Sequence, residues 1–272
     1  MYPILFNLGP LTIRSYGLFL VLAFILGTYI VWKEGKRGGY NEEKLLDFCV
    51  AVLIGALVGA RLYYCLLNLD AFSSDLLKIF YFWQGGSAFH GALLGGFASG
   101  WYFVKKVKWP LFQIADLAAI AASLATAVAK IGAFLSGSDF GTATSMPWGT
   151  HQLGQLGARH PTQLYEAFFH LGLFFILRRL DKDKKRSGGV FFFYLLAIGM
   201  GRWFFEFFRG DSTYLLGVKV AQIVSLVLVL IGMVGLYYFS RRDWKSDFRY
   251  LLVRSERLNF SKLKFWRKKK HD

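Results

Sequence analysis

The stretch that decides the fold is GVKVAQIVSLVLVLIGMVGLYYF, residues 217–239. It carries one charge, Lys219, close to its start, and it contains no proline. A helix of about 20 apolar residues, rising about 1.5 Å per residue, is long enough to cross a hydrocarbon layer about 30 Å thick. The stretch therefore predicts a transmembrane helix.

The same pattern recurs through the 272-residue chain. Hydrophobic residues make up 55% of it, more than one soluble core of this size needs to bury, so the surplus is expected to face lipid. The first apolar run lacks a basic leader and a cleavage site of small residues, which indicates a retained span and not a signal peptide. We expect an all-α integral membrane protein of about seven transmembrane helices. The predicted spans are residues 16–32, 45–66, 87–104, 113–135, 162–177, 189–208 and 217–239.

The placement of Lys and Arg predicts the orientation. Most of the 33 basic residues lie in segments that alternate along the chain with segments poor in basic residues. Basic residues next to a span resist export, so these segments are expected on the cytoplasmic side. With seven spans, the amino terminus is then outside and the carboxyl terminus is cytoplasmic. The basic segments are residues 33–44, 105–108, 178–186 and 241–272.

The chain is expected to have two parts. Residues 1–240 form the seven-helix membrane domain, with an external loop at 136–161, and residues 241–272 form a basic cytoplasmic tail. Apolar residues recur in this tail at nearly helical spacing, consistent with a short interfacial helix. The net charge of +16 could suggest nucleic acid, but much of it lies in the tail, beside the anionic inner leaflet. We expect the tail to bind anionic membrane lipids and expect no nucleic-acid partner.

Several ionisable residues lie inside or at the ends of the predicted spans. Each is costly in hydrocarbon, so each is expected to face the bundle interior, a partner or water. Arg202 and Glu206 are four residues apart, which places them on one helix face and allows a structural ion pair. Several cations and carboxylates in one small bundle also indicate a cavity for an anionic group such as phosphate. The residues are Asp47, Arg61, His90, Asp116, Lys130, Glu166, His170, Arg202 and Glu206.

His90 lies in GGSAFHG, residues 85–91, at the outer start of the third predicted span. The glycines allow close backbone approach, and an imidazole can act as a base near neutral pH. A lone histidine is also often a structural hydrogen-bonding residue, and that alternative remains open. His151 and His160 lie far apart in sequence without a pattern of carboxylates, so we expect no metal site.

Four separate blocks with polar residues occur in a familiar order: LGP and RSYGL at residues 8–10 and 14–18, GGSAFHG at 85–91, HPTQLYE at 160–166, and GR with EFFR at 201–202 and 206–209. In these blocks the chain resembles the bacterial phosphatidylglycerol:prolipoprotein diacylglyceryl transferases, over nearly its whole length. The resemblance implies a seven-span fold with an external amino terminus, in the bacterial cytoplasmic (inner) membrane.

The family's signature segment reads approximately Gly-Arg-Ile-Gly-Asn-Phe-Ile-Asn-Gly-Glu-Leu-Trp-Gly. In this chain it corresponds to AKIGAFLSGSDFG, residues 129–141. The frame is kept at Gly132, Gly137 and Gly141, but Lys130 replaces the arginine, Ala133 and Ser136 replace the two asparagines, and Ser138 replaces the glutamate. In the family this segment helps to hold the lipid headgroup.

The resemblance implies transfer of the diacylglyceryl group of phosphatidylglycerol to the thiol of the lipobox cysteine of a secreted prolipoprotein, with release of glycerol phosphate and without a cofactor. His90 would take the thiol proton, and Arg202 with Lys130 would stabilise the leaving phosphate. Tyr16 would bind the headgroup, and Glu206 would orient Arg202. The implied catalytic residues are His90, Arg202, Glu206 and Tyr16; the phospholipid-binding residues are Lys130, Arg202, Gly141 and Tyr16; other candidates are His160, Tyr165 and Glu166.

Two alternatives to an active transferase stay open. One is a divergent member that uses another acceptor or headgroup, because Lys130 keeps the positive charge while Ala133 removes a hydrogen-bonding side chain. The other is a non-catalytic protein of the same fold that binds a lipid or a lipoprotein.

Overall fold

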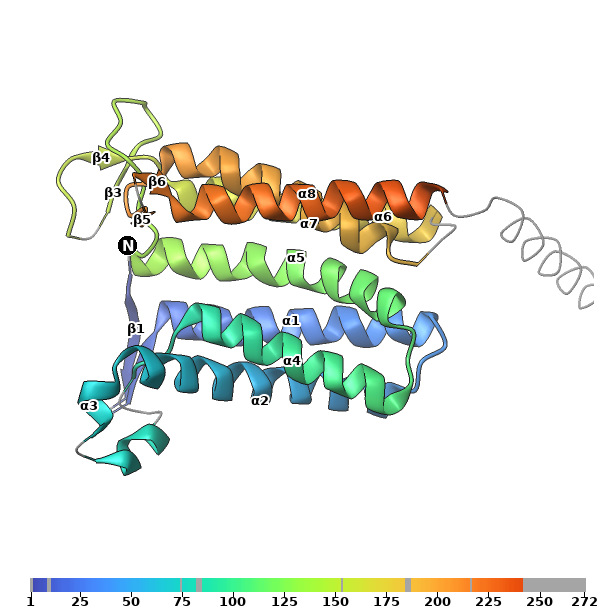
Figure 1. Cartoon of the computed structure of the whole chain (residues 1–272). Helices are drawn as coiled ribbons and strands as arrows, with labels where there is room; N and C mark the ends of the chain where they lie inside the picture. The colour runs from blue at the N-terminus through green and yellow to red at the C-terminus, as the bar shows by residue number, and fades with distance from the viewer. Residues whose placement is uncertain are drawn as a thin grey trace, which may run out of the picture.

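A computed structural model describes residues 2–8, 11–73, 75–81, 85–152, 154–183, 187–215 and 217–241. Within them, seven helices of 17 to 26 residues run side by side (Figure 1). The predicted interfacial helix of the tail lies outside the described residues. The long helices are α1 Ser15–Arg37, α2 Glu42–Leu67, α4 Phe89–Val107, α5 Leu111–Ser136, α6 Thr162–Asp183, α7 Gly189–Phe205 and α8 Val220–Arg241.

The long helices coincide with the predicted spans, each beginning within one turn of the predicted start. The largest difference is at the end of α6, which continues through Arg178 to Asp183. The predicted span ended at residue 177 because the charged residues that follow are costly in hydrocarbon. Arg and Lys are nevertheless good helix formers, so the helix continues past its apolar part. The all-helical membrane fold is confirmed. Five helices are long and apolar enough to cross a membrane, whereas α4 and α6 are less apolar, so the count of seven spans stays a prediction.

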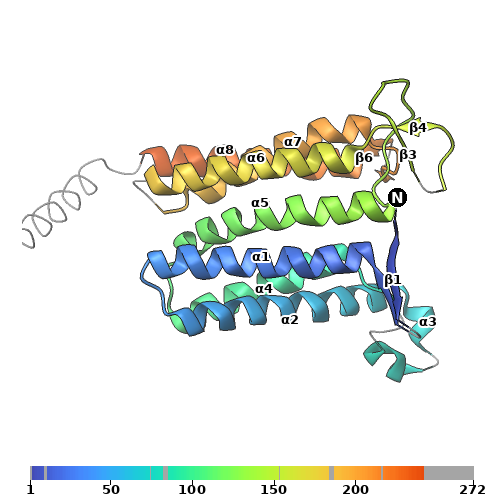
Figure 2. The same ribbon diagram turned by 180° about the vertical axis from the view of Figure 1, so that it is seen from behind.

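Helix α5 lies in the middle of the bundle. It packs against α1 on one side and against α6 and α7 on the other, while α2 pairs with α4 and α7 with α8. Figures 1 and 2 show α5 between these two groups of helices. The buried residues of α5 include Ala119, Ala121 and Ala127, whose small side chains let neighbouring helices approach closely. Polar residues at the end of α5 are therefore within reach of several helices.

The outer surface of the bundle is strongly apolar. Large hydrophobic side chains are exposed on several helices, among them Ile54, Phe97, Phe168 and Val234. Apolar surface of this extent is unfavourable in water and marks a surface covered by another apolar phase. The exposed residues therefore support a lipid-facing exterior.

Short elements gather at one end of the bundle, which we call the hairpin end (Figure 1). Strand β1 crosses this end and is fixed there by hydrogen bonds from Tyr2 N–H to Leu135 O, 2.9 Å, and from Ser15 N–H to Pro3 O, 3.0 Å. Strand β1 therefore forms an ordered cover over part of this end of the bundle. The short elements are the antiparallel pairs β1 Ile4–Leu8 with β2 Leu11–Arg14, β3 Thr150–His151 with β4 Ala158–Arg159, and β5 Tyr214–Leu215 with β6 Val218–Lys219, together with α3 Leu69–Ser73 and 3₁₀ turns at Leu76–Phe80 and Glu206–Phe208.

Helices α2 and α4 touch backbone to backbone through glycines. A Cβ atom added at Gly59 would lie 2.8 Å from the Cα of Gly95, and it would also meet the carbonyl oxygen of Gly91. Backbone atoms cannot move aside as the end of a flexible side chain can. The close packing of α2 on α4 therefore requires glycine at position 59.

Replacing Gly59 by alanine is expected to destabilise the protein by about 1 to 3 kcal/mol, because the new methyl group overpacks this contact. Gly172→Ala is the matched control, since Gly172 is also helical but an added Cβ there would have no other atom within 4 Å. At this position the better helix propensity of alanine, worth up to about 1 kcal/mol, should leave stability unchanged or raised. Thermal unfolding of the detergent-solubilised variants measures both. Equal unfolding temperatures for the two variants would contradict the packing argument.

Candidate active site

Seven charged side chains meet at the hairpin end, and we call them the ion-pair cluster. Helices α5 and α7 end at this end of the bundle and α6 begins there, so residues distant in sequence come together (Figure 1). Three cations face four carboxylates. The members are Lys130, Asp139, Glu166, Arg202, Glu206, Arg209 and Asp211.

Glu166, in the second turn of α6, is the centre of the cluster. Its side chain is only 6% exposed, and one carboxylate oxygen lies 2.6 Å from Lys130 Nζ. The other oxygen lies 3.4 Å from Arg202 Nη1 and 3.5 Å from Arg209 Nη1. Glu166 thereby links cations from α5, from α7 and from the segment that follows the 3₁₀ turn.

Asp139 lies in the loop after α5 and contacts two cations of the cluster. Its Oδ2 lies 2.7 Å from Lys130 Nζ and its Oδ1 lies 3.3 Å from Arg209 Nη2. Burial alone would raise the pKa of the Asp139 carboxyl, but the positive charges of Lys130 and Arg209 outweigh it and lower the pKa below its ordinary value. Asp139 is therefore ionised at neutral pH.

Arg202 has the loosest ion pairs of the three cations. It lies 3.4 Å from Glu166 and 3.6 Å from Glu206, the latter across the predicted spacing of four residues. Its side chain is 37% exposed, against 16% for Lys130 and 8% for Arg209. Glu206 is buried, and its Oε2 has no hydrogen-bond donor among the described residues. Arg202 is thus the cluster's most accessible cation for an incoming anion.

Tyr16 and Gly141 both lie next to the cluster. Tyr16, in the first turn of α1, packs its backbone over Gly132 of α5 and interacts electrostatically with Lys130 and Asp139. Gly141 is buried and forms an isolated antiparallel bridge with Arg209. A side chain at Gly141 would collide with the backbone of His160, near the other end of the same loop. The glycine therefore allows the two ends of this loop to pack closely beside Arg209.

His160 and Tyr165 join the external loop to the end of α7. The His160 ring nitrogen Nδ1 lies 3.2 Å from the Tyr165 hydroxyl, and Trp148 Nε1 donates to the same hydroxyl at 2.8 Å. Both rings also pack against Phe208, which directly precedes Arg209. This aromatic group borders the ion-pair cluster, and Trp148 in it was not predicted from the sequence.

His90 is not joined to the cluster. It begins α4 at the hairpin end and is exposed, with the ring of Phe89 beside it. Helix α4 packs mainly against α2, and among the described contacts none connects His90 to the cluster. The structure thus brings together Lys130, Glu166, Arg202 and Glu206, and leaves His90 at the same end on another helix pair.

Two other buried charges have structural partners. The Arg61 guanidinium donates to five carbonyl oxygens between Lys78 and Gly86, and so holds the loop that precedes His90. Asp116 accepts hydrogen bonds from the N–H groups of Gly188, 2.7 Å, and Phe191, 2.8 Å, at the start of α7. These contacts explain how both charges are accommodated in buried positions.

The altered signature segment, residues 129–141, comprises the last turns of α5 and the start of the following loop. Ser136 Oγ donates to the Ala133 carbonyl at 3.0 Å and lies 2.9 Å from Ser138 Oγ, while Gln163 Nε2 donates to the Ser138 carbonyl at 2.6 Å. Both serines therefore have a local structural role. Ala133 itself is buried, so its side chain faces other parts of the protein and not solvent.

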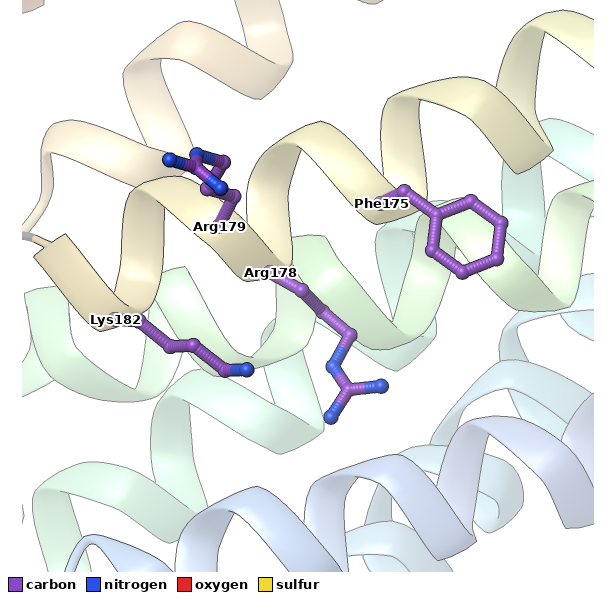
Figure 3. Close-up of a pocket in the computed structure, with 4 residues that line it drawn as sticks. All are labelled: Phe175, Arg178, Arg179 and Lys182. Carbon is purple, nitrogen blue, oxygen red and sulfur yellow. The ribbon is translucent and has the colours of Figure 1, made fainter.

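A second group of basic residues lies at the opposite end of the bundle, on α6. A hollow of about 390 Å³ there is lined by Phe175, Arg178, Arg179 and Lys182. Figure 3 shows Arg178 and Lys182 extending to the same side of the helix. Arg178 also pairs with Glu34 of α1 at 2.8 Å. The hollow coincides with a basic segment that is predicted to face the cytoplasm.

Comparison with known proteins identifies the family. The family model for "Prolipoprotein diacylglyceryl transferase" matches residues 3–238. The chain belongs to this family. A phosphatidylglycerol--prolipoprotein diacylglyceryl transferase of Clostridioides difficile (strain 630) is 34% identical over 238 residues, which cover 88% of this chain and 95% of the relative. The enzyme of the same name from Geobacter sulfurreducens is 35% identical over 250 residues, covering 88% and 96%, and that from Trichormus variabilis is 34% identical over 248 residues, covering 86% and 88%.

Membership of the diacylglyceryl transferase family confirms the resemblance seen in the sequence blocks, and it places the chain among transferases that act in lipoprotein biosynthesis. The ion-pair cluster includes residues from two of those blocks, Glu166 from one and Arg202, Glu206 and Arg209 from the other, together with Lys130 and Asp139 from the signature segment. The family match does not assign the role of each residue, which has to follow from its geometry.

Proposed function

We propose that the protein transfers the diacylglyceryl group of phosphatidylglycerol to the thiol of the lipobox cysteine of secreted prolipoproteins. The observation that carries this proposal is the accessible Arg202 within a cluster of cations at the hairpin end, in a chain of this family. An anionic phospholipid headgroup requires such a site. A guanidinium with two loosely held donors is suited to a phosphate.

In the proposed reaction a cysteine thiolate attacks the glyceryl carbon that bears the phosphate ester. A C–S bond forms, the C–O bond breaks, and glycerol phosphate leaves with the electron pair of the broken bond. Negative charge then builds up on the leaving phosphate, where Arg202 and Lys130 stabilise it. Glu206 orients Arg202, and Tyr16 offers a hydroxyl to the headgroup.

We propose His90 as the base that takes the thiol proton. Because His90 lies outside the ion-pair cluster, this role requires the acceptor cysteine to enter between the start of α4 and the cluster. The aromatic group of Trp148, His160 and Tyr165 would then border the path of the acceptor.

A second candidate is transfer of the diacylglyceryl group from a phospholipid with a different headgroup. It is favoured by Lys130, whose ammonium already contacts Asp139 and Glu166 and which cannot offer the bidentate contact of an arginine. A non-catalytic lipid-binding role would use the same cations without transfer.

A transfer assay tests the proposal. Purified protein is mixed with phosphatidylglycerol labelled in its acyl chains and a lipobox peptide, and the label on the peptide is measured. Label should appear with the cysteine peptide and not with a peptide that has serine at that position. If the peptide is labelled only when another phospholipid is the donor, the second candidate is favoured. If no phospholipid labels the peptide, the non-catalytic lipid-binding role is favoured.

We further propose that the protein lies in the bacterial cytoplasmic membrane with the hairpin end outside and the basic tail inside, bound to anionic lipids. Cys49 and Cys65 are buried, so substituted cysteines can be labelled against a low background. In intact cells a membrane-impermeant thiol reagent should label Ser145→Cys, in the external loop, and not Glu43→Cys, in the first turn of α2; both positions are exposed. The reverse pattern would overturn the orientation.

A further inference from the structure

We infer that Asp139 occupies the anion position of the ion-pair cluster as a built-in competitor, and that the phosphate of the lipid headgroup must displace it. This inference rests on the proposed function and concerns how the same site admits its lipid. It makes Asp139 a residue that sets lipid affinity.

The placement of the Asp139 carboxylate is the first argument. Its two oxygens contact two different cations, Lys130 through Oδ2 at 2.7 Å and Arg209 through Oδ1 at 3.3 Å. A phosphodiester also presents two unesterified oxygens, and two cations on either side are the partners it would take. Asp139 therefore fills the position that suits the phosphate.

The charge balance of the cluster is the second argument. Its three cations already face four carboxylates, so an anionic phosphate would meet cations that have carboxylate partners. Carboxylates and phosphate close together repel one another strongly in a poorly hydrated site. Binding is favourable once a carboxylate leaves the cations to the phosphate.

Asp139 is the carboxylate best able to leave. Glu166 and Glu206 are 6% and 1% exposed, and Asp211 binds Arg209 through both of its oxygens at 2.9 and 3.0 Å. The Asp139 side chain is 33% exposed and lies on a loop. It can therefore turn toward water at a smaller cost than the other three.

The backbone at Asp139 is held by contacts that do not involve its side chain. Thr162 Oγ1 donates to the Asp139 carbonyl at 3.0 Å, and the residue has a left-handed φ of +60°. A turn of the side chain alone, without opening of the loop, is then enough to release Lys130 and Arg209.

The experiment compares native protein with Asp139→Asn and Asp139→Gly, both of which suit a left-handed backbone. Retention of radiolabelled phosphatidylglycerol by immobilised protein in detergent is measured at rising lipid mole fraction, together with KM and kcat of transfer. Removing the competitor should lower the lipid concentration for half-saturation, and the KM, by roughly five- to tenfold, since the site is then open in more of the molecules. A residue that only ties the loop would instead leave both values unchanged or raise them.

Asp211→Asn is the matched control, because it removes one negative charge from the same cluster without freeing the position between Lys130 and Arg209. It should lower the half-saturation value much less. An equal gain in this control, or no gain in either Asp139 variant, would overturn the inference. If no variant transfers lipid, the proposed function fails, but the retention measurement still decides the role of Asp139.

Discussion

Replacing Arg202 by glutamine is expected to lower the rate of diacylglyceryl transfer by about 100-fold or more. Removal of one well-placed donor to a developing oxyanion commonly costs about this much in other enzymes. Arg202 is the most accessible cation of the cluster, and its contacts with Glu166 and Glu206 are long, at 3.4 and 3.6 Å. Its loss should therefore affect the leaving phosphate far more than it affects folding. The rate of label transfer and the unfolding temperature measure the two effects separately.

Two further variants define the cause of this loss. Arg202→Lys keeps the charge and loses only the planar fork, so it should retain clearly more activity than Arg202→Gln. Arg178→Gln removes a helical arginine that is also paired with a glutamate, but at the opposite end of the bundle, and should change transfer little. Equal losses in both Arg202 variants would show that Arg202 acts as a structural partner of Glu206.

The helices could be predicted from sequence because their signal is local. An apolar run such as that of α8 specifies a membrane helix without reference to the rest of the chain. The short hairpins carry no comparable signal. The pair β3 Thr150–His151 and β4 Ala158–Arg159 is only two residues long on each strand, and its position depends on contacts of the loop with the end of α7.

Part of the ion-pair cluster could be predicted for a related reason. Lys130, Glu166, Arg202 and Glu206 lie in or beside apolar spans, where a charge is costly and therefore informative. Asp139 and Asp211 lie in loops, where a charge is ordinary. Only the folded chain shows that both reach Arg209.

The partners of each charge could not be read from the sequence. Arg202 and Glu206 are four residues apart and are expected to pair, yet the shortest contacts of the cluster join Lys130 to Glu166 and to Asp139. These contacts depend on how α5 packs against α6. The exposed position of His90 likewise depends on the packing of α4 against α2.

Replacing Glu166 by alanine is expected to destabilise the protein more than any other single change in the cluster. Glu166 contacts Lys130, Arg202 and Arg209, and its removal takes one carboxylate partner from each of these three cations in a poorly hydrated site. Breaking a buried ion pair in this way typically costs about 3 to 5 kcal/mol. For a chain of this length that corresponds to a fall of roughly 10 °C in unfolding temperature, measured on detergent-solubilised protein.

Glu34→Ala provides the matched control at the other end of the bundle. Glu34 also pairs with two arginines, Arg37 and Arg178, but their side chains are 56% and 29% exposed, so water replaces the lost partner and the cost should be about 1 kcal/mol or less. A second change, Lys130→Met, made together with Glu166→Ala, should recover part of the lost stability, because it removes a cation that has lost its shortest ion pair. If Glu166→Ala instead unfolds at the temperature of the native protein, the cluster must be hydrated, and Arg202 would then act on the phosphate through water and not in a site of low polarity.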